Sequence, residues 1–320
     1  MGKKMRIWLI VGISLLVIGG IVFTVAMSLL GWEFARLSIG NYQTNEYALT
    51  EDFDSIYVRA READIRFLPS ENGECRVVCV EKESVPHTAE VQNGKLVITA
   101  VGVEKWYENF FNFNRETLTV YLPKQGYTTL SIEGKTGDVE VPKEFSFENA
   151  QVATSTGDIR WYASASGRIV LTASTGGITV ENISASSLKL TVSTGGVSVT
   201  DVNCTDGVDV QVSTGEAYLK NVACKSFVSG GGTGDISLKN VQAEERLSIE
   251  RGTGDVRFDG CDGGEIVVTT GTGDIRGTLL SSKTFYANTT TGSVNVPQGA
   301  TGGSCTLKTT TGDIHVRVLE

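Results

Sequence analysis

Carboxylates recur at one position of this sequence, where they could bind a cation. An acidic side chain directly follows a Thr-Gly pair at Asp138, Asp158, Glu216, Asp235, Asp255, Asp274 and Asp313. Calcium is held by carboxylate and carbonyl oxygens, which makes Asp235, Asp255 and Asp274 candidate Ca²⁺ ligands. The alternative is that each Asp hydrogen-bonds the backbone of its own turn. We favour this structural role, because Ca²⁺-binding β-roll repeats have about half the period found here and because Gly177 and Gly196 interrupt the acids.

Cysteine and histidine are too sparse to predict a metal centre or a catalytic triad. The chain has six Cys and two His, and the histidines, His87 and His315, lie far apart. Cys75 and Cys79 stand in an alternating run, so they lie on one face of one strand, about 13 Å apart and beyond disulfide reach. A C-x₃-C pair without a second Cys or His pair nearby does not predict zinc. We therefore expect no metal, no cofactor and no catalytic residue.

Glycan-cleaving enzymes form a further class to test, since some parallel β-helices cleave polysaccharides. A glycosidase needs only two carboxylates, and acids are plentiful. A catalytic groove usually interrupts such a repeat with long loops, however, and the near-constant spacing described below leaves no room for them. The sequence contains no G-x-S-x-G, H-E-x-x-H or P-loop motif. The net charge of −9 disfavours a nucleic-acid ligand, because phosphate binding needs clustered Lys and Arg.

The acids belong to a repeat with a period of 19 or 20 residues, which dictates the fold. Its Thr-Gly pairs begin at Thr136, Thr156, Thr175, Thr194, Thr214, Thr233, Thr253, Thr272, Thr291 and Thr311. Apolar residues follow Thr at the third and, in nearly every copy, the fifth position, as in Ile236 and Leu238. A second strand precedes Thr, with apolar residues six and four positions back, as in Leu188 and Leu190. Because only stacked copies bury these faces, the sequence predicts an all-β protein, a parallel β-solenoid of about ten rungs, roughly 45 Å long.

Further columns fit the same register. Turns with the full Thr-Gly-Asp motif include Thr156, Gly157, Asp158, Thr233, Gly234, Asp235, Thr253, Gly254, Asp255, Thr272, Gly273 and Asp274. Seven residues after Thr, a side-chain ladder that hydrogen-bonds the backbone of a corner is predicted, at Asn182, Asp201, Asn221 and Asn240. Ten residues after Thr every side chain is small, so Cys204 and Cys224 are interpreted as fillers of a tight corner. One strand spacing also places these two thiols within disulfide range.

An uncharged apolar run predicts a membrane-spanning helix near the N-terminus. The 24 residues 7–30 carry no charge, and about 20 are enough to cross a bilayer. Lys3, Lys4 and Arg6 precede the run and few charges follow it closely, so the positive-inside rule places residues 1–6 in the cytoplasm and the C-terminal domain outside the cell. A cleaved signal peptide is the alternative, but the run is longer than usual for one and no A-x-A motif follows it. We expect an uncleaved single-pass anchor in the cell membrane.

Two regions are expected beyond the anchor, joined to it by a linker at residues 31–50. Residues 51–130 alternate like strands and are interpreted as longer, degenerate rungs, and the repetitive solenoid covers residues 131–320. The first region contains an aromatic segment, Trp106, Tyr107, Phe110, Phe111 and Phe113. We expect this segment to cap the open end of the solenoid, with contact to a ligand, a partner or the membrane surface as the alternative.

The last rung ends with the chain, which leaves a sheet edge. His315, Arg317 and Glu320 place polar and charged groups there, and such groups protect an edge from pairing with another molecule. We therefore expect a monomeric ectodomain.

Several segments together resemble a known bacterial family. They are the N-terminal anchor, residues 53–58 (Phe-Asp-Ser-Ile-Tyr-Val), residues 118–123 (Leu-Thr-Val-Tyr-Leu-Pro) and serial Ser-Thr-Gly-Asp-Ile units such as residues 155–159. Over residues 45–320 they resemble the "putative adhesin" domain of unknown function, a TGD-repeat family common in Gram-positive bacteria. The resemblance implies a β-strand repeat at the cell surface and supplies no catalytic residue. Some relatives are encoded beside envelope-stress regulators, which implies, by analogy, a sensing or damping role.

The sequence therefore favours a membrane-anchored, extracytoplasmic β-solenoid that acts as an adhesin-like binding or scaffolding surface at the cell envelope. Its expected partner, besides the membrane, is an envelope protein or a glycan. The first alternative is an accessory regulator in envelope-stress sensing that binds a membrane partner through the span and the aromatic segment. The second, less favoured, is a polysaccharide-acting β-helix enzyme.

Overall fold

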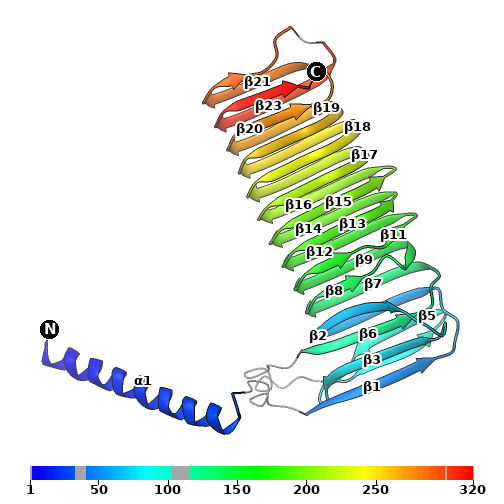
Figure 1. Cartoon of the computed structure of the whole chain (residues 1–320), viewed down its shortest axis with the longest axis vertical. Coiled ribbons are helices and arrows are strands. Elements are labelled where there is room, and N and C mark those ends of the chain that lie inside the picture. Colours follow the sequence, from blue (N-terminus) through cyan, green and yellow to red (C-terminus); the bar gives the residue numbers. More distant parts are fainter. Residues whose placement is uncertain (1, 33–40, 103–114, 300, 320) are drawn as a thin grey trace.

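The structure of the chain, a computed structural model, describes residues 2–32, 41–102, 115–299 and 301–319. Within these residues, one helix, α1 (Lys3–Leu29), precedes 24 strands that are connected in one hydrogen-bonded sheet. The sheet is wound into a long column of stacked rungs (Figure 1). The predicted parallel β-solenoid with one N-terminal apolar helix is confirmed.

Helix α1 contains the one candidate membrane span of the described chain. This segment, Arg6–Leu29, has 24 residues and a mean hydropathy of 2.7, and none of its most apolar window is buried. Its large apolar side chains, such as Leu16 and Leu29, are exposed in the absence of a membrane. Lipid or a protein partner buries such side chains of an apolar helix.

Six strands build the N-terminal end of the column: β1 (Tyr42–Leu49), β2 (Ser55–Pro69), β3 (Cys75–Lys82), β4 (His87–Gln92), β5 (Lys95–Ala100) and β6 (Glu116–Leu122). Strand β2 pairs in parallel with β5 and β6 on one side and with β7 (Gly126–Thr136) and β8 (Val139–Val141) on the other, so it lies between two levels of the solenoid. Strand β4 pairs with β5, β3 with β6 and β1 with β3, each antiparallel. The region combines parallel rungs with antiparallel extensions, which corrects the expectation of degenerate rungs alone.

Strand β1 lies in the stretch expected to be a linker. Its residues Tyr47 and Leu49 pack against the core, and the strand pairs with β3 along its whole length. Residues 42–49 therefore belong to the sheet, although they lie within the stretch expected to be a linker.

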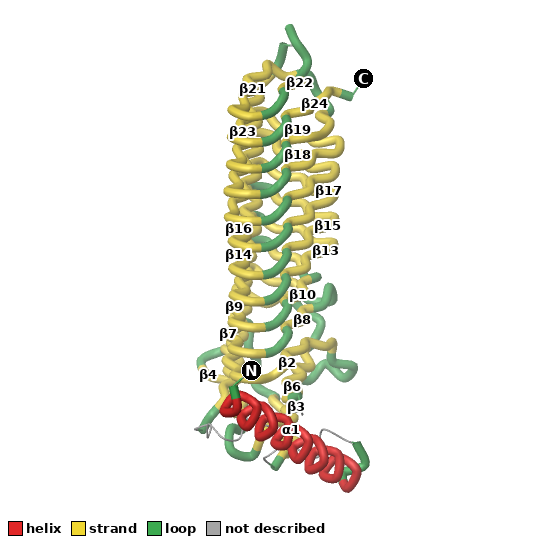
Figure 2. The backbone as a smooth tube through the Cα atoms, turned by 90° about the vertical axis from the view of Figure 1, so that its left-hand side faces the viewer, coloured by secondary structure: helices red, strands yellow, loops and turns green. Residues whose placement is uncertain are grey.

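The remaining strands complete the solenoid: β9 (Ser146–Thr156), β10 (Ile159–Trp161), β11 (Ser164–Ala165), β12 (Arg168–Thr175), β13 (Ile178–Ala185), β14 (Ser187–Thr194), β15 (Val197–Cys204), β16 (Gly207–Thr214), β17 (Ala217–Thr233), β18 (Ile236–Thr253), β19 (Val256–Thr272), β20 (Ile275–Leu279), β21 (Lys283–Thr291), β22 (Val294–Asn295), β23 (Gly303–Thr311) and β24 (Ile314–Val318). Equivalent Thr residues pair from rung to rung, as Thr175 does with Thr194. The turns therefore line up along the column (Figure 2).

The apolar columns face inward, as predicted, and form one continuous core. Leu188, Leu190, Ile236 and Leu238 are all buried. The core extends from Ile56 in β2 to Val316 in β24. Burying one such side chain contributes about 1.5–3 kcal/mol, so stacking of rungs supplies most of the stability of the column.

The last two rungs stack in the reverse of their order in the chain. Thr311 of β23 pairs with Thr272 of β19 on one side and with Thr291 of β21 on the other. Strand β24 likewise pairs with both β20 and β22. Figure 1 shows β23, in red, between β21, in orange, and the rest of the column.

The exposed edge at the distal end is therefore the rung of residues 283–295. His315 pairs with Arg276 on one side and with Asn295 on the other, so the prediction that it guards the edge is wrong. Arg317 pairs with Thr278 on one side, and its role stays a prediction. Glu320 lies outside the described residues. The repeat pattern does not reveal this inversion, because β21 and β23 carry the same Thr-Gly register and either could occupy either level.

Candidate functional site

The Thr-Gly-Asp turns line one edge of the column and position its most regular polar groups. The Gly of each turn has a positive φ, for example 134° at Gly157 and 127° at Gly234. The N–H of Gly234 donates to the carbonyl of Thr253 in the next rung at 2.9 Å. A Cβ on Gly234 would collide with the carbonyl of Gly215, because the backbones of neighbouring rungs stack directly here. Glycine is therefore required by both conformation and space.

The Asp carboxylates of these turns bind the backbone of the neighbouring rung. Oδ1 of Asp235 accepts the N–H of Asp255, and Oδ1 of Asp255 accepts the N–H of Asp274, both at 2.9 Å. Oδ1 of Asp274 accepts the N–H of Asp313 at 2.7 Å. The expected bond to the Asp's own turn is replaced by one between rungs, because strand spacing brings the equivalent N–H of the next rung within reach.

These bonds form an Asp ladder in two series, which end and resume at Gly177 and Asp235, and different residues stand at its two outer ends. Asp64 of β2, which no Thr-Gly pair precedes, accepts the N–H of Asp138 at 3.0 Å. At the distal end, Ser293 donates both its N–H and its hydroxyl to Oδ1 of Asp313, each at 2.9 Å. Ser293 has no carboxylate, so the terminal rung offers a further rung no carboxylate oxygen at this position. The Ser that interrupts the acids in the sequence is the end of the ladder in space.

Arginines on the adjacent strand neutralise successive carboxylates. Arg257 reaches Oδ2 of Asp235 at 3.3 Å and Oδ2 of Asp255 at 2.8 Å. Arg276 reaches Oδ2 of Asp274 at 2.6 Å. Each of the three candidate Ca²⁺ ligands thus has one oxygen on a backbone N–H and the other on a guanidinium. Hydrogen-bond donors of the protein therefore engage the carboxylates of Asp235, Asp255 and Asp274. Ca²⁺ binding by these residues stays an untested prediction.

The same arrangement occurs near the start of the ladder. Arg160 binds Oδ2 of Asp138 and Oδ2 of Asp158, both at 3.1 Å. Burial raises the pKa of Asp138, but hydrogen bonds from the Asp158 N–H and from Arg160 outweigh it, so the net pKa lies below its usual value. The column is therefore a series of charge-compensated turns rather than a row of repelling acids.

The polar ladder predicted seven residues after Thr is present at Asp201, Asn221 and Asn240, and its bonds join side chains to one another rather than to the corner backbone. Asn221 Nδ2 donates to Asp201 Oδ1 at 2.7 Å, and Asn240 Nδ2 donates to Asn221 Oδ1 at 3.0 Å. These residues and Asn182 have φ between 52° and 55°, the left-handed conformation that Asn and Asp tolerate best after Gly. The tight corner favours Asn or Asp because its backbone is left-handed, and the ladder supplies hydrogen-bond partners for their side chains.

The cysteines are buried and form no disulfide. All six are free thiols in the interior. Cys204 pairs with Ala185 and Cys224 with Ala243 in neighbouring strands, which agrees with their interpretation as small fillers of one corner. Burial raises the pKa of Cys204 to about 11 and that of Cys224 to about 12, so both thiols are protonated and unreactive near neutral pH.

The predicted partner-binding aromatic segment, Trp106, Tyr107, Phe110, Phe111 and Phe113, lies outside the described residues, and its role stays a prediction. A different aromatic series lies inside the first rungs. Ring centroids are separated by 6.0 Å between Phe53 and Tyr127, by 6.0 Å between Tyr127 and Phe147, and by 5.8 Å between Phe147 and Trp161. Tyr127 and Phe147 stand one repeat apart in the sequence, and that spacing is the signal that could have revealed the series.

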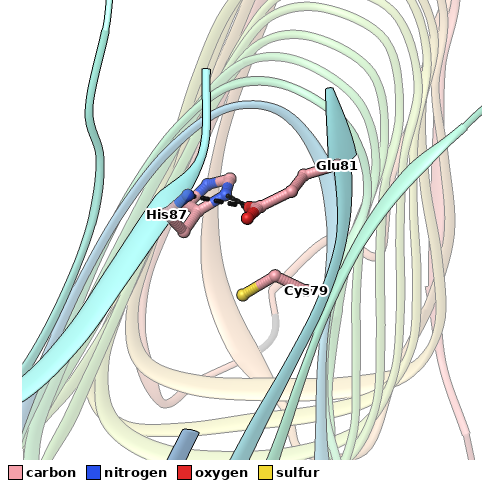
Figure 3. Close-up of side chains that lie close together, drawn as sticks. All are labelled: Cys79, Glu81 and His87. Atoms are coloured by element: carbon pink, nitrogen blue, oxygen red, sulfur yellow. Dashed lines mark hydrogen bonds and ion pairs between the residues drawn. The ribbon is translucent and has the colours of Figure 1, made fainter. Parts of the chain in front are cut away.

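A polar cluster is buried at the N-terminal end, where the sequence predicted no site (Figure 3). Cys79 and Glu81 alternate on one face of β3 and are 0% exposed, and His87, which opens β4, is 2% exposed. Oε2 of Glu81 accepts the backbone N–H of His87 at 2.8 Å and lies 2.6 Å from its ring Nδ1. Asn45 of β1 donates to the other oxygen, Oε1, at 2.6 Å. Residues of β1 and β4 therefore hold the Glu81 carboxylate of β3 in place.

One nitrogen of this Cys79–Glu81–His87 cluster is left without a partner. Ring Nε2 of His87 is buried and has no hydrogen-bond partner. The Cys79 thiol stays protonated, because burial and then the nearby Glu81 carboxylate raise its pKa to about 12. One donor atom from each of the three residues lies within 4.8 Å of the other two, an arrangement that could hold a metal ion.

A second buried group of charges occupies the same end of the column. Nζ of Lys82 lies 3.3 Å from Oε2 of Glu62 and 3.5 Å from Oε1 of Glu116. Burial raises the pKa of Glu116 to about 7, even though Lys82 acts in the opposite direction. These residues could not be singled out from the sequence, because Glu81 and Lys82 stand at the end of a strand, where charged side chains are usually solvated. In the structure, strands β1, β4 and β6 cover them.

Known proteins resemble this chain in sequence or in structure. Solved structures that resemble the chain include "putative adhesins" from Parabacteroides distasonis (14% identity, 88% of this chain and 98% of that one, TM-score 0.49), Parabacteroides merdae (13% identity, 88% and 97%, TM-score 0.46) and Bacteroides fragilis (13% identity, 88% and 99%, TM-score 0.43). No functionally curated protein matches the chain significantly. The family model described as Toastrack DUF4097 matches residues 53–221 and 205–320. These two matches together span most of the sequence, and the chain therefore belongs to the Toastrack DUF4097 family.

Proposed function

We propose that this chain is a single-pass membrane protein that presents a rigid β-solenoid outside the cell as a non-catalytic binding or scaffolding surface. The observation that carries the proposal is the unburied apolar span Arg6–Leu29 directly before a regular column of rungs. Lys3, Lys4 and Arg6 at the start of the span favour a cytoplasmic N-terminus. Partners that we propose are an envelope protein or a glycan.

The side-chain chemistry of the column supports a surface rather than an enzyme. A pair of catalytic carboxylates needs one acid poised to donate a proton and another free to react. The acids of the Asp ladder that we describe instead bind backbone N–H groups and guanidinium groups, as Asp255 does with Asp274 N and Arg257. Such engaged carboxylates keep rungs in register.

Topology is tested by fusing alkaline phosphatase or a fluorescent protein to the C-terminus. We expect an active phosphatase fusion and a dark fluorescent fusion, because only the phosphatase matures outside the cytoplasm. Intact mass measurement of the membrane fraction then separates an anchor from a signal peptide. An uncleaved chain has a mass of 34.2 kDa, and a shorter chain in the medium would contradict the anchor.

Partner and assembly are tested on the native membrane. Cross-linking of intact cells followed by affinity purification is expected to recover an envelope protein or glycan attached to the solenoid. Recovery of one membrane-bound regulator through the span would favour the accessory regulator instead. The proposed monomeric ectodomain would be overturned by defined oligomers at equilibrium in the ultracentrifuge.

A further inference from the structure

We propose that Arg59, Arg61 and Lys135 form a binding site for the phosphodiester groups of a linear envelope glycopolymer, and that a row of serines extends this site along the column. Three cations and one acid, Glu133, line the cavity concerned, in a chain whose net charge is −9. The inference rests on the proposed extracytoplasmic surface, because it names the chemistry of a glycan that this surface binds.

The cavity lies at the N-terminal end of the column. It has a volume of about 440 Å³ and is lined by residues 59–61 of β2, by Ala100 at the end of β5 and by residues 133–135 of β7. The small residues Ala60, Ala100 and Gly134 leave room beside the three long cationic side chains. A volume of this size accommodates a phosphate together with the polyol or sugar units attached to it.

Arg61 and Lys135 stand opposite each other on neighbouring strands, although both are positively charged. They lie between two pairs of in-register residues of β2 and β7, Ala60–Gly134 and Glu62–Thr136. Both side chains are exposed, and neither forms an ion pair within the described residues. Like charges directly opposite each other destabilise a sheet. An anion bound between the two would remove the repulsion, so this pair points to an anionic ligand.

Arg59, the third cation, is only weakly engaged. Two other arginines of the column, Arg160 and Arg257, each bind two carboxylates. Arg59 has Glu133 alone, at 3.4 Å, and the two side chains are 68% and 52% exposed. An ion pair this exposed contributes little, so Arg59 can exchange Glu133 for a phosphate. A guanidinium binds phosphate oxygens through two parallel hydrogen bonds, which favours that exchange.

A row of serine hydroxyls continues from Lys135 along the column. Serine precedes the Thr of the turn in each of the next four rungs, at Ser155, Ser174, Ser193 and Ser213. These Thr residues pair in register, so the serines stand one strand spacing apart, about 4.8 Å, beside the aligned turns (Figure 2). All four serines are exposed, and their hydroxyls have no hydrogen-bond partner among the described residues. In the next rung Gly232 takes this position, and the row ends.

The cavity and the serine row together favour a polymer over a single anion. The cavity supplies positive charge for a phosphodiester, and the row supplies hydroxyls that can hydrogen-bond the hydroxyls of the following units. A lipid headgroup would occupy the cavity and leave the row unused. A neutral glycan would leave Arg61 and Lys135 without an anion. A polymer of polyol or sugar phosphates fits both parts of the site.

The test uses the full-length chain in a non-ionic detergent, with a synthetic glycerol phosphate hexamer as the probe in isothermal titration calorimetry. We expect binding that weakens as the salt concentration rises, because exposed charges are screened. Maltohexaose, a neutral hexamer, should not bind. The double variant Arg61→Gln, Lys135→Gln should bind the phosphate hexamer about 10-fold more weakly or worse.

The matched control is the double variant Lys95→Gln, Lys124→Gln. It removes two exposed cations from the same end of the column, outside the cavity, and should leave the affinity for the hexamer unchanged. Equal affinity of the wild type and the Arg61→Gln, Lys135→Gln variant would overturn the site. If the variants do not fold by circular dichroism, the wild type decides: no binding of the hexamer, or binding no tighter than that of maltohexaose, would overturn it.

A serine variant and a lipid probe separate the polymer from other phosphates. Ser174→Ala with Ser193→Ala should weaken binding of the hexamer about threefold or more and leave binding of monomeric glycerol phosphate unchanged. Equal hexamer affinity in this variant and the wild type would overturn the role of the row. Tighter binding of dihexanoyl phosphatidylglycerol than of the hexamer would assign the cavity to a lipid headgroup and overturn the polymer.

Failure of this inference can be distinguished from failure of the proposed function. Calorimetry in detergent does not depend on the orientation of the chain in a membrane. The phosphatase and fluorescent fusions test that orientation and do not depend on the hexamer. Absence of hexamer binding with an active phosphatase fusion would therefore overturn the phosphodiester site alone.

Discussion

The guanidinium of Arg251 occupies the space that a side chain on Gly231 would fill in the rung beside it. Arg251 is 2% exposed and donates to Ser229 Oγ at 3.1 Å and to the carbonyl of Val212 at 3.4 Å. Its Nε has no partner, and no carboxylate in the described part of the chain forms an ion pair with it. Burial lowers the pKa of Arg251, which shows that the interior disfavours its charge. The absence of a side chain at Gly231 therefore leaves the space in which the solenoid accommodates the large polar side chain of Arg251.

Replacing Arg251 by Met is expected to raise the free energy of unfolding by about 1 kcal/mol or more, because a buried charge is exchanged for an apolar side chain of similar length. Gly231→Ala should lower it by about 1–3 kcal/mol through overpacking. Thermal unfolding of the full-length chain in detergent, followed by circular dichroism, measures both. The Gly231→Ala loss should shrink in the Arg251→Met background, and strictly additive effects would contradict the contact.

Adjacent glycines of one turn provide a matched test of the stacking geometry. Gly195 has a φ of 141°, and a Cβ there would collide with the carbonyl of Gly176. For Gly196 the nearest atom to a Cβ is 3.5 Å away, an ordinary contact. Gly195→Ala is expected to cost about 2–3 kcal/mol or to prevent folding, whereas Gly196→Ala should stay within about 1 kcal/mol of the wild type. Similar thermal unfolding of the two variants would contradict the requirement for Gly.

The regular part of the fold could be predicted because every rung repeats the same physical requirements. Inward apolar residues such as Leu190 and Ile236 recur at fixed distances from Thr-Gly, and the Asn ladder recurs at its corner. The fit of Arg251 over Gly231 could not be predicted, since each departs from the repeat by itself and only the pairing of their strands brings them together. The Cys79–Glu81–His87 cluster could not be predicted for a related reason. It depends on antiparallel strands, and no repeat in the sequence specifies their register.

The inverted order of the last rungs predicts an order of backbone protection. Strand β23 has neighbours on both sides, whereas β21 is paired only with β23 among the described strands. Amide hydrogen exchange read out by mass spectrometry should therefore be slower in Gly303–Thr311 than in Lys283–Thr291, although β23 lies nearer the C-terminus. Slower exchange in β21 than in β23 would contradict the inversion.

Two substitutions of Asn221 separate backbone conformation from the side-chain ladder. Asn221 has a φ of 52° and bridges Asp201 and Asn240. Asn221→Gly keeps the left-handed conformation but loses the ladder, and should cost up to about 1 kcal/mol. Asn221→Ala loses both and should cost about 1–2 kcal/mol more. Denaturant unfolding measures the difference, and an Ala variant as stable as the Gly variant would show that the conformation imposes no strain.

Acidification should remove the contribution of Asp138. Its pKa is lowered in the folded state, so its stabilising effect is present above the unfolded value near 4 and is lost as pH falls through the folded pKa. Because the side chain is 35% exposed, solvent screening limits the effect to about 1 kcal/mol. Asp138→Asn should therefore lower the free energy of unfolding at pH 7 and converge with the wild type near pH 2.

Glu148→Gln is the matched control for this experiment, because Glu148 is an exposed acid outside the Asp ladder. Its pH profile should follow that of the wild type. A constant difference between Asp138→Asn and the wild type from pH 2 to pH 7 would mean that the carboxylate charge contributes nothing.

The distinct residues at the two ends of the Asp ladder bear on how this gene can change in length. Asp64 begins the ladder, Ser293 ends it, and the last rung is inserted beneath the one before it. Duplication of an interior unit adds a level whose contacts repeat those already present. A copy stacked on the exposed rung of residues 283–295 would instead meet Ser293, which has no carboxylate to accept the next backbone N–H. We therefore expect that the column lengthens during evolution by internal duplication, in steps of 19 or 20 codons.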